Sequence, residues 1–499
     1  MIPAPSRSRL VCALLLLAIP AAAENIEILR DAFGAPHIFA ATPAGAAFGA
    51  GYAQAGDRTV ALLANLRNAG EADPSVLSRA VRPIVNAYAA GINRYLEEHP
   101  ELKAAPVSAA NVAAYSRRAF QWIHGSNDLL LAPSRTTSKS VIAVLDPIAD
   151  WNAPDRPYEM TLYATEGGLA MAGVAPPGIP FPVVGHTQFI TVGWSGSPKD
   201  AGAAALDEAW SLLTARTLAE AHRALSMNQI PGAAFIGTAG GEIFDSGGAS
   251  AAGGFLRRAG PSKNGDAASL ELLRVQRTWP FGRVQDLAFS TDVYKADAWQ
   301  ARLAKSVPES KFARRLTGWN RRADADSVEA LAFYLLKMEL GPDAASLEPP
   351  QSLSDTRLRA ALIRAQDRLE VDFDYGSKFG DLFRVAREGA HESNPVGGGV
   401  IPQAGMETAR TIFFQRPASS FPAAAHIGNS GQAATRIVEL SAQTPSSSIL
   451  MPGVSDDPES TFFDDQARNL SPTLSTKPAY FRDRKELERH LSSRKQLIF

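Results

Sequence analysis

The stretch HGSNDLLLAPSRTTSKSVIAVLDP, residues 124–147, places a small polar pair, Ser126 and Asn127, directly before an apolar run. One interpretation of this pair is an ordinary loop. The other is a bond that the protein cleaves in its own chain, which would leave Ser126 as a new N-terminus. Gly125 suits such a cleavage site, because a residue without a Cβ atom tolerates the strained backbone that attack on the preceding carbonyl requires.

An N-terminal serine would carry its own base. A serine attacks an amide only when a nearby group removes its hydroxyl proton, and most hydrolases use a histidine for this step. The α-amine of an N-terminal residue has an ordinary pKa of about 7.7–8.0, so a useful fraction of it is neutral near physiological pH. Ser126 is therefore a candidate nucleophile that would use its own freed α-amine.

The N-terminal part of the chain predicts a strand pair followed by helices. Residues 25–40 alternate apolar and polar side chains around a glycine and a proline, which is typical of two paired strands. Residues 42–69 have helical spacing and small side chains suited to close packing. Residues 76–106 predict one or two amphipathic helices ended by Pro106.

The rest of the chain changes from strands to helices and then to loops. Between Ser126 and about Gly254, short apolar runs bounded by glycine and proline predict strands. Helical spacing returns over residues 266–279 and 325–340, and the last third mixes glycine- and proline-rich loops with short strands. This order predicts an α+β fold in which helices pack on large antiparallel sheets.

Composition and charge exclude several classes of function. The chain has 499 residues, of which 45% are hydrophobic and 20% are charged, and its formal net charge is -1. Such a balance is typical of a globular protein and provides no basic surface for nucleic acid or an anionic membrane. The single cysteine, Cys12, lies in the first few residues. Disulfides, thiolate metal sites and a cysteine nucleophile are therefore excluded for a chain that loses this segment.

Residues 1–23 have the pattern of a signal peptide. Arg7 and Arg9 form a short basic region, residues 10–19 are apolar, and residues 21–23 are three alanines that form a small-residue cleavage site. The apolar run is too short to span a bilayer, and no later stretch is apolar enough to do so. We expect cleavage after Ala23 and a periplasmic or secreted protein.

Other motifs that could carry chemistry are better explained as structure. FDSGG (244–248) and GWSGS (193–197) resemble serine-nucleophile motifs, but the first lacks the partner residues and the second lacks the G-x-S-x-G spacing, so both are expected to be turns. The histidines form no pair at metal-ligand spacing, so zinc catalysis is not expected. The acidic stretch SDDPESTFFDDQ (455–466) is expected to be a solvated loop.

Several stretches, in the same order, resemble the penicillin acylase family of N-terminal-nucleophile (Ntn) hydrolases. IEILRDAFGAPHIFA (26–40) and FGAGYAQAGDR (48–58) resemble the start of the small α subunit of that family. GSN followed by PSRT resembles the start of its β subunit, and TVGWSGSPKD (191–200) continues the resemblance. Two late stretches resemble the branch of aculeacin and acyl-homoserine-lactone acylases: FGDLFRVAREGAHESNPVGGG (379–399) and PGVSDDPESTFFDDQARNLSPTLSTKPAYF (452–481).

The resemblance implies an αββα sandwich of antiparallel sheets flanked by helices. It implies cleavage between Gly125 and Ser126, with residues 24–125 as the α segment and 126–499 as the β segment of a heterodimer. Ser126 would attack an acyl amide, and water would then hydrolyse the acyl-enzyme. The backbone N–H of Gly196 would be one donor to the oxyanion, whose loss typically costs on the order of 10²–10³ in rate.

The sequence also departs from the family pattern. The segment that carries the second oxyanion donor, an asparagine, is absent, and Asn264 is the nearest candidate. Ile148 stands where many members have a histidine that holds the nucleophile's amine. Asp200 matches one calcium ligand of some members, but Ala203 stands at another, so no cofactor is expected and calcium only if that site survives.

Two functions in different classes remain open. The first is an exported amidohydrolase that acts on acyl-homoserine lactones, lipopeptides or penicillin-type substrates, and the intact Gly125-Ser126-Asn127 triplet favours it. The alternative is a degenerate homologue that binds acylated small molecules without cleaving them. The missing asparagine segment and the change at Ile148 favour the alternative.

Overall fold

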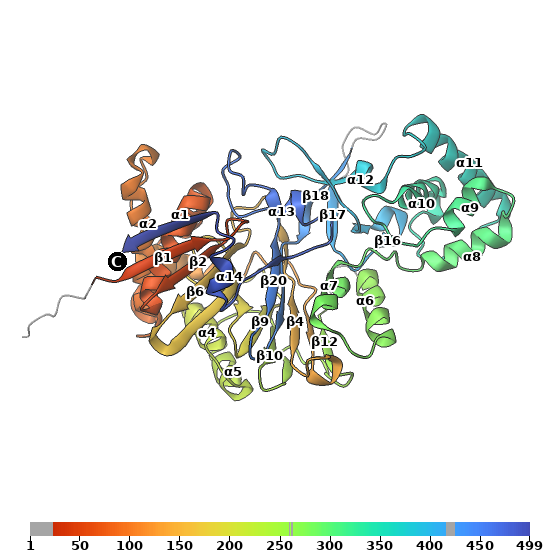
Figure 1. Cartoon of the computed structure of the whole chain (residues 1–499). Coiled ribbons are helices and arrows are strands. Elements are labelled where there is room, and N and C mark those ends of the chain that lie inside the picture. The colour runs from red at the N-terminus through yellow and green to blue at the C-terminus, as the bar shows by residue number, and fades with distance from the viewer. Residues whose placement is uncertain (1–22, 259, 261–262, 416–424) are drawn as a thin grey trace, which may run out of the picture.

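Two large β-sheets lie face to face between layers of helices (Figure 1). The computed structural model describes residues 23–258, 260, 263–415 and 425–499, with no side chains described for 263–265. The predicted signal peptide, apart from its last residue, therefore lies outside the described residues. In spatial order, the nine-stranded sheet contains β11 (Ile243–Asp245), β10 (Ala234–Thr238), β9 (Ile190–Trp194), β8 (Val184–His186), β7 (Leu169–Ala175), β6 (Tyr158–Ala164), β2 (Pro36–Ala40), β1 (Asn25–Arg30) and β22 (Ser493–Ile498).

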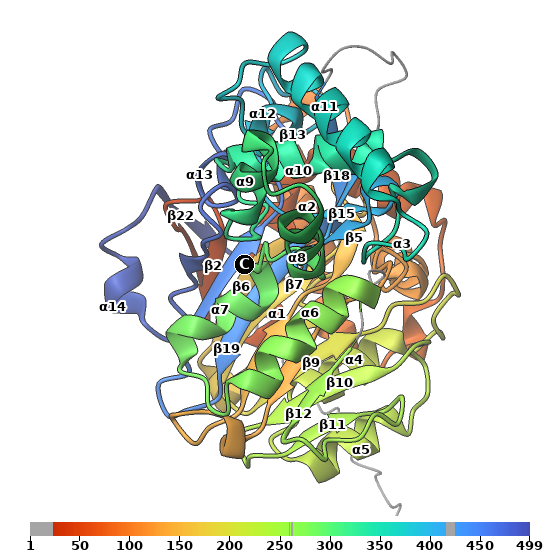
Figure 2. The same cartoon turned by 90° about the vertical axis from the view of Figure 1, so that its right-hand side faces the viewer.

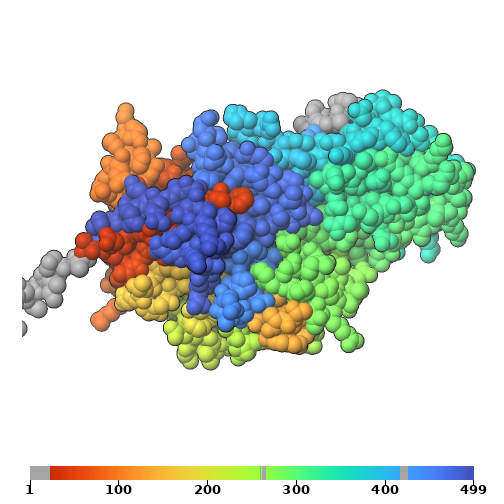
Figure 3. All heavy atoms as spheres, in the orientation of Figure 1, coloured from red at the N-terminus to blue at the C-terminus, as the bar shows by residue number. Residues whose placement is uncertain are grey.

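The nine-stranded sheet joins the two ends of the chain. Every neighbouring pair in it is antiparallel except β2 and β6. The first strand, β1, pairs along its whole length with the last strand, β22, from Asn25↔Ile498 to Arg30↔Ser493. In the space-filling view, red N-terminal residues are accordingly bordered by blue C-terminal ones (Figure 3).

The six-stranded sheet contains the apolar runs that follow Ser126 within residues 124–147. In spatial order its strands are β12 (Phe255–Arg257), β3 (Leu129–Leu131), β4 (Ile142–Leu145), β19 (Ala434–Glu439), β20 (Ser446–Leu450) and β21 (Lys477–Pro478). All neighbours are antiparallel, and β3 and β4 are buried along their whole length. Strands with both faces buried carry continuous apolar runs, which explains the LLL and IAVL sequences.

Helices cover the outer faces of both sheets. Helix α1 (Pro43–Asn68) packs on β1, β2 and β6, and α2 (Val81–Glu98) packs along α1. On the other side, α7 (Phe281–Phe289) packs on β4 and β19 (Figure 2). Strands β4 and β9 contact each other across the two sheets. The four layers are therefore helix, sheet, sheet and helix, and the predicted αββα sandwich of class α+β is confirmed.

A third sheet connects the sandwich to a lobe of helices. In spatial order its strands are β14 (Asn394–Pro395), β13 (Phe383–Val385), β18 (His426–Gln432), β17 (Ile412–Gln415), β15 (Val400–Ile401) and β16 (Met406–Glu407), and β5 (Ile148–Asp150) pairs with β18. The lobe, at the right in Figures 1 and 3, contains α8 (Ala296–Ser306), α9 (Lys311–Thr317), α10 (Val328–Glu339) and α11 (Asp355–Val371). It has a hydrophobic core of its own around Trp299, Phe312 and Phe333.

The predicted elements agree with the structure in part. The strand pair at 25–40 and the helix at 42–69 are confirmed, and the side chain of Thr42 caps α1. The second helix ends at Glu98 rather than Pro106, because His99 precedes Pro100 and leaves the helical conformation. The remaining helices are α3 (Ala109–Tyr115), α4 (Ala205–Leu213), α5 (Leu218–Leu225), α6 (Lys263–Val275), α12 (Phe379–Leu382), α13 (Asp465–Asn469) and α14 (Arg484–Leu487). Of these, α4 and α5 interrupt a region predicted as strands.

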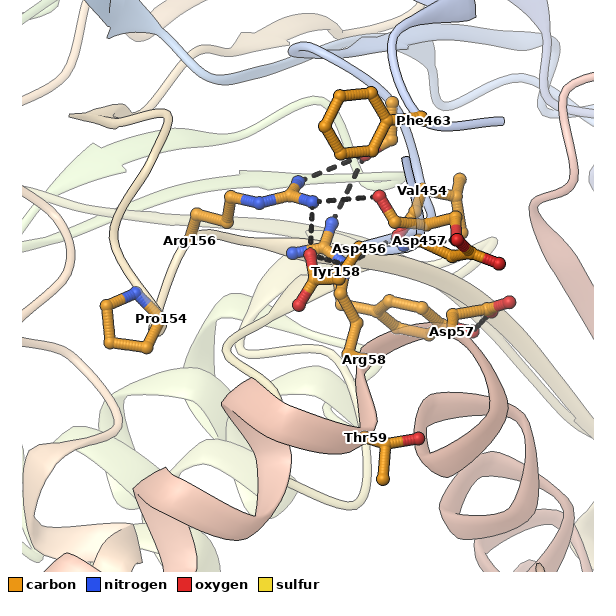
Figure 4. A network of polar contacts seen from close by, with 12 residues as sticks. Asp57, Arg58, Thr59, Pro154, Arg156, Tyr158, Val454, Asp456, Asp457 and Phe463 are labelled. Atoms are coloured by element: carbon orange, nitrogen blue, oxygen red, sulfur yellow. Dashed lines mark hydrogen bonds and ion pairs between the residues drawn. The ribbon is translucent and has the colours of Figure 1, made fainter. Parts of the chain in front are cut away.

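A cluster of three arginines around Asp456 ties distant parts of the chain together (Figure 4). The Oδ1 atom of Asp456 lies 2.6 Å from Arg156 Nη2 and 3.3 Å from Arg58 Nε, and it also contacts Arg387 Nη2. The three guanidinium groups donate as well to main-chain carbonyls of residues 453–455. The prediction of a solvated loop at 455–466 is therefore wrong at Asp456, whose carboxylate is the counterion of three nearly buried cations.

Charge favours the ionised form of Asp456. Burial opposes ionisation, but the guanidinium groups of Arg58, Arg156 and Arg387 together lower the pKa of this carboxyl below its ordinary value. The side chains of the three arginines are at most 8% exposed. Removing the carboxylate would leave these cations without a counterion in a poorly solvated environment.

We expect Asp456→Asn to lower the free energy of unfolding by about 3–5 kcal/mol, as for a broken buried ion pair. The matched control is Asp457→Asn, because Asp457 is exposed and its Oδ1 atom only accepts a local hydrogen bond from the Glu459 N–H. Urea denaturation followed by circular dichroism measures both. Equal stability of the two variants would show that the arginines are held by the carbonyls alone.

Candidate active site

Ser126 lies three residues before β3 and is buried. Ser126 is only 1% exposed, and its backbone forms an isolated antiparallel bridge with Pro147. The N–H of Asn127 donates to the carbonyl of Asp146 at 2.9 Å, which continues the pairing of β3 with β4. Gly125 has a φ of 144°, in the region that L-residues with a side chain avoid. The backbone before Ser126 therefore requires glycine.

The main chain of Ile148 holds the peptide group between Gly125 and Ser126. The N–H of Ile148 donates to the carbonyl oxygen of Gly125 at 2.9 Å, and the carbonyl of Ile148 accepts from the N–H of His124 at 2.8 Å. The side chain of Ile148 is buried and cannot form a hydrogen bond. Its main chain nevertheless places a donor on the carbonyl that a Ser126 hydroxyl would attack, and a main-chain donor leaves no signature in the sequence.

Two carboxylates flank Ser126 on neighbouring strands. Asp128 and Asp146 are both almost fully buried, and Asp128 Oδ1 accepts the N–H of Asp146 at 2.8 Å. Among the described residues, neither Ser126 Oγ nor Asp128 Oδ2 has a hydrogen-bond partner. No sequence motif marks these carboxylates, although each stands at the end of an apolar strand, where a charged side chain is unusual.

Asp146 is the centre of a buried polar network. Its oxygens accept from Gln432 Nε2 at 2.5 Å, from Thr435 Oγ1 at 2.6 Å and from Asn127 Nδ2 at 3.3 Å. Asn127 Nδ2 also donates to Thr411 Oγ1 at 3.0 Å. Burial raises the pKa of Asp146 to about 6, although the hydrogen bonds to the charged form partly offset this effect. The network fixes Asn127, the residue that follows Ser126 in the chain.

Gly196, the predicted backbone donor, lies beside the segment that leads to Ser126. It has a φ of 73°, and a Cβ atom at this position would lie 1.9 Å from the carbonyl oxygen of Ile123. The preceding Ser195 accepts a hydrogen bond from the N–H of Ala233 through its Oγ atom at 2.9 Å, and so joins the ends of β9 and β10. This structural contact accounts for the serine in GWSGS.

The chain that leads to Asn264 passes beside the site. The N–H of Arg258 donates to the carbonyl of Asp128 at 2.9 Å, and a Cβ atom on Gly260 would lie 1.8 Å from Asn127 Oδ1. Asn264 follows in the first turn of α6, and its side chain lies outside the described part of the structure. Its role as an oxyanion donor stays a prediction.

Asp200, the candidate calcium ligand, lies on an exposed turn. Its Oδ1 atom accepts a hydrogen bond from Gln121 Nε2 at 2.9 Å, and the neighbouring Lys199 is also exposed. Within the described ranges, no group of three or more histidine, cysteine, aspartate or glutamate side chains is arranged to hold a metal ion. The same part of the chain contains no helix that is long and apolar enough to cross a membrane.

Sequence comparison identifies the family to which the chain is related. The profile of the family described as penicillin amidase matches residues 25–71, 102–202 and 267–484. These segments define the chain as a hydrolase of amide carbon–nitrogen bonds. It belongs to the penicillin amidase family. A solved structure of a thermostable penicillin G acylase from Alcaligenes faecalis is similar, with a TM-score of 0.46 and 12% identity over 75% of this chain and 99% of that one.

The raised pKa of Asp146 predicts a specific dependence of stability on pH. Because the folded state holds a proton on Asp146 up to about pH 6, while the unfolded state loses it near the ordinary pKa of 3.8, the free energy of unfolding falls as pH rises between these values. The expected fall is about 2–3 kcal/mol. Urea denaturation across this range, in a Ser126→Ala background, measures it.

Asp146→Asn in the same background should lose this part of the pH dependence. Asp465, whose pKa burial raises to about 7, titrates in both proteins and cancels in the comparison. Parallel stability curves for the two proteins would show that Asp146 ionises as easily in the folded state as in the unfolded chain.

Proposed function

We propose that the protein is an exported acylase that activates itself by cleaving its chain between Gly125 and Ser126. The observation that carries the proposal is the hydrogen bond from the Ile148 N–H to the Gly125 carbonyl, next to a buried serine hydroxyl. A carbonyl under attack develops negative charge on its oxygen, and a fixed main-chain donor stabilises that charge. The positive φ of Gly125 places this peptide group in a conformation that glycine adopts readily and other residues avoid.

Cleavage would supply the base for the mature enzyme. The new α-amine of Ser126 would remove the proton from the Ser126 hydroxyl, which then attacks the carbonyl of an acyl amide. The head-group amine leaves, and water hydrolyses the acyl-enzyme. The Gly196 N–H and the Asn264 side chain are the proposed donors to the oxyanion in this reaction.

Cleavage would leave two chains that stay paired as an αβ heterodimer. Residues 24–125 would keep β1 between β2 and β22, and β2 would keep its pairing with β6 of the second chain. Arg58 of the first chain would keep its contacts with Asp456 and the Val454 carbonyl of the second. Such extensive pairing supports a complex that does not separate after processing.

For the substrate, we propose an amide between a long acyl chain and a small head group, as in acyl-homoserine lactones or lipopeptides, with penicillin-type amides as an alternative. The stretches at 379–399 and 452–481, which resemble the aculeacin and acyl-homoserine-lactone acylase branch, support this choice. The signal-peptide pattern of residues 1–23 supports export to the periplasm or beyond. Neither a nucleic acid nor a membrane is a proposed partner.

The decisive variant is Ser126→Ala, with Ser195→Ala as the control serine near the site. Intact mass spectrometry should show the wild type and Ser195→Ala as two fragments, one of them starting at Ser126, and Ser126→Ala as one chain. Hydrolysis of fluorogenic acyl amides should be lost only in Ser126→Ala. An uncut wild-type chain without hydrolysis would support the alternative of a degenerate homologue that binds acylated molecules.

A further inference from the structure

Self-cleavage has a requirement that the mature enzyme does not share. Before cleavage, the nitrogen of Ser126 is part of a peptide bond, so there is no α-amine to take the hydroxyl proton. Another group must accept that proton for the first attack. This requirement rests on the proposed self-cleavage, and a residue of this chain has to meet it.

Among the described side chains near Ser126, a carboxylate oxygen of Asp128 is available to accept a proton. His124 is exposed, and Ile148 offers no titratable side chain. Both oxygens of Asp146 accept hydrogen bonds from side chains. Asp128 Oδ2, in contrast, is buried and has no hydrogen-bond partner among the described residues, and the same holds for Ser126 Oγ.

The geometry brings these two atoms to the same face of the chain. Residues 126–128 are extended, with Ser126 bridged to Pro147 and Asn127 bonded to Asp146, and residues two apart in an extended segment point the same way. Ser126 Oγ is close enough to the Asp128 carboxyl to be among the groups that lower its pKa.

The Asp128 carboxylate is fixed with one oxygen available. Asp128 Oδ1 accepts the Asp146 N–H at 2.8 Å. Asp128 Oδ2 packs against β9 at Gly193, where a Cβ atom would lie 2.5 Å away, so glycine provides the space for this oxygen. Arg258 Nη1 lies 3.8 Å from Oδ2, while Arg258 Nη2 bonds Asp245 Oδ1 at 2.7 Å. The closer partner of the arginine is therefore Asp245.

The surroundings also suit proton transfer. Burial raises the pKa of Asp128, whereas Arg258, the Asp146 N–H and the Ser126 hydroxyl lower it and Asp245 raises it again. The net direction is upward. A carboxylate with a raised pKa is a better proton acceptor than an ordinary one while it remains ionised near neutral pH.

We propose that the carboxylate of Asp128 accepts the hydroxyl proton of Ser126 in self-cleavage and then donates it to the leaving nitrogen. Ser126 Oγ bonds to the carbonyl carbon of Gly125, and the Ile148 N–H stabilises the oxyanion. As the carbon–nitrogen bond breaks, the proton passes from Asp128 to the nitrogen, which leaves an ester between Gly125 and Ser126 Oγ. Water hydrolyses the ester and releases a Gly125 carboxylate and the free serine.

Asp128→Asn tests the proposal, because asparagine keeps the oxygen that accepts the Asp146 N–H but cannot take the proton. We expect self-cleavage of the full-length chain to slow by about 10²–10⁴, the usual contribution of a general base. Asp245→Asn is the matched control, because it removes a carboxylate beside the same arginine without contacting Ser126. It should cleave within a few-fold of the wild-type rate.

The pH profile separates a proton acceptor from a structural residue. Arg258, Asp245 and Asp146 are the charged groups beside Asp128, and the control keeps both Arg258 and Asp146. In wild type and Asp245→Asn, the cleavage rate should rise with pH as Asp128 ionises and then level off. In Asp128→Asn this rise should be absent, while near-UV circular dichroism shows the same folded chain.

Two results would overturn the proposal. One is an Asp128→Asn chain that cleaves at the wild-type rate with the same pH profile. The other is a slow Asp128→Asn chain that hydroxylamine splits rapidly at residue 125, because the ester would then have formed without Asp128. Either result leaves the proposed function intact as long as Ser126→Ala stays uncut. A wild-type chain that never cleaves would contradict the proposed function itself.

Discussion

The pair of main-chain hydrogen bonds between Ile148 and residues 124–125 fixes the peptide that precedes Ser126, and the surrounding site is arranged about it. These bonds bring the end of the N-terminal segment against the corner between β4 and β5. That corner in turn is fixed by β18, which pairs with β5 and supplies Gln432 to Asp146. A short segment of irregular backbone is thus held by two sheets, which gives it a defined geometry without regular secondary structure.

The fold was largely predictable from the sequence because its strands have strong local signals. The alternation at 25–40 and the apolar runs of β3 and β4 identify strands whatever their neighbours are. Helices α4 and α5 were missed because they are short, and their apolar positions resemble the strand runs around them. The α2 end depended on the conformation of one residue, His99, next to a proline. Helix ends of this kind are decided locally and are hard to place from periodicity.

The site was predictable only where a residue type carries the chemistry. Ser126 and Gly125 could be selected because the proposed nucleophile and the glycine before it are adjacent in the chain. The contribution of Ile148 could not, because a main-chain N–H has no sequence signature. Asp128 and Asp146 could have been noticed as charges within apolar strands, but which carboxylate has a free oxygen depends on Gln432 and residues still farther along the chain. The acidic stretch at 455–466 was misjudged for the same reason, since its arginine partners come from three separate segments.

The pairing of β22 with β1 brings together two strands from opposite ends of the sequence. Strand β1 is synthesised first, yet one of its two edges is covered only by the strand synthesised last. Until β22 pairs with it, β1 has a row of unpaired main-chain donors and acceptors along one edge. Such an open edge can pair with another chain and so promotes aggregation. The nine-stranded sheet is therefore complete only once β22 has paired with β1. Before that pairing forms, the open edge of β1 is a place where the strand of another chain could pair instead.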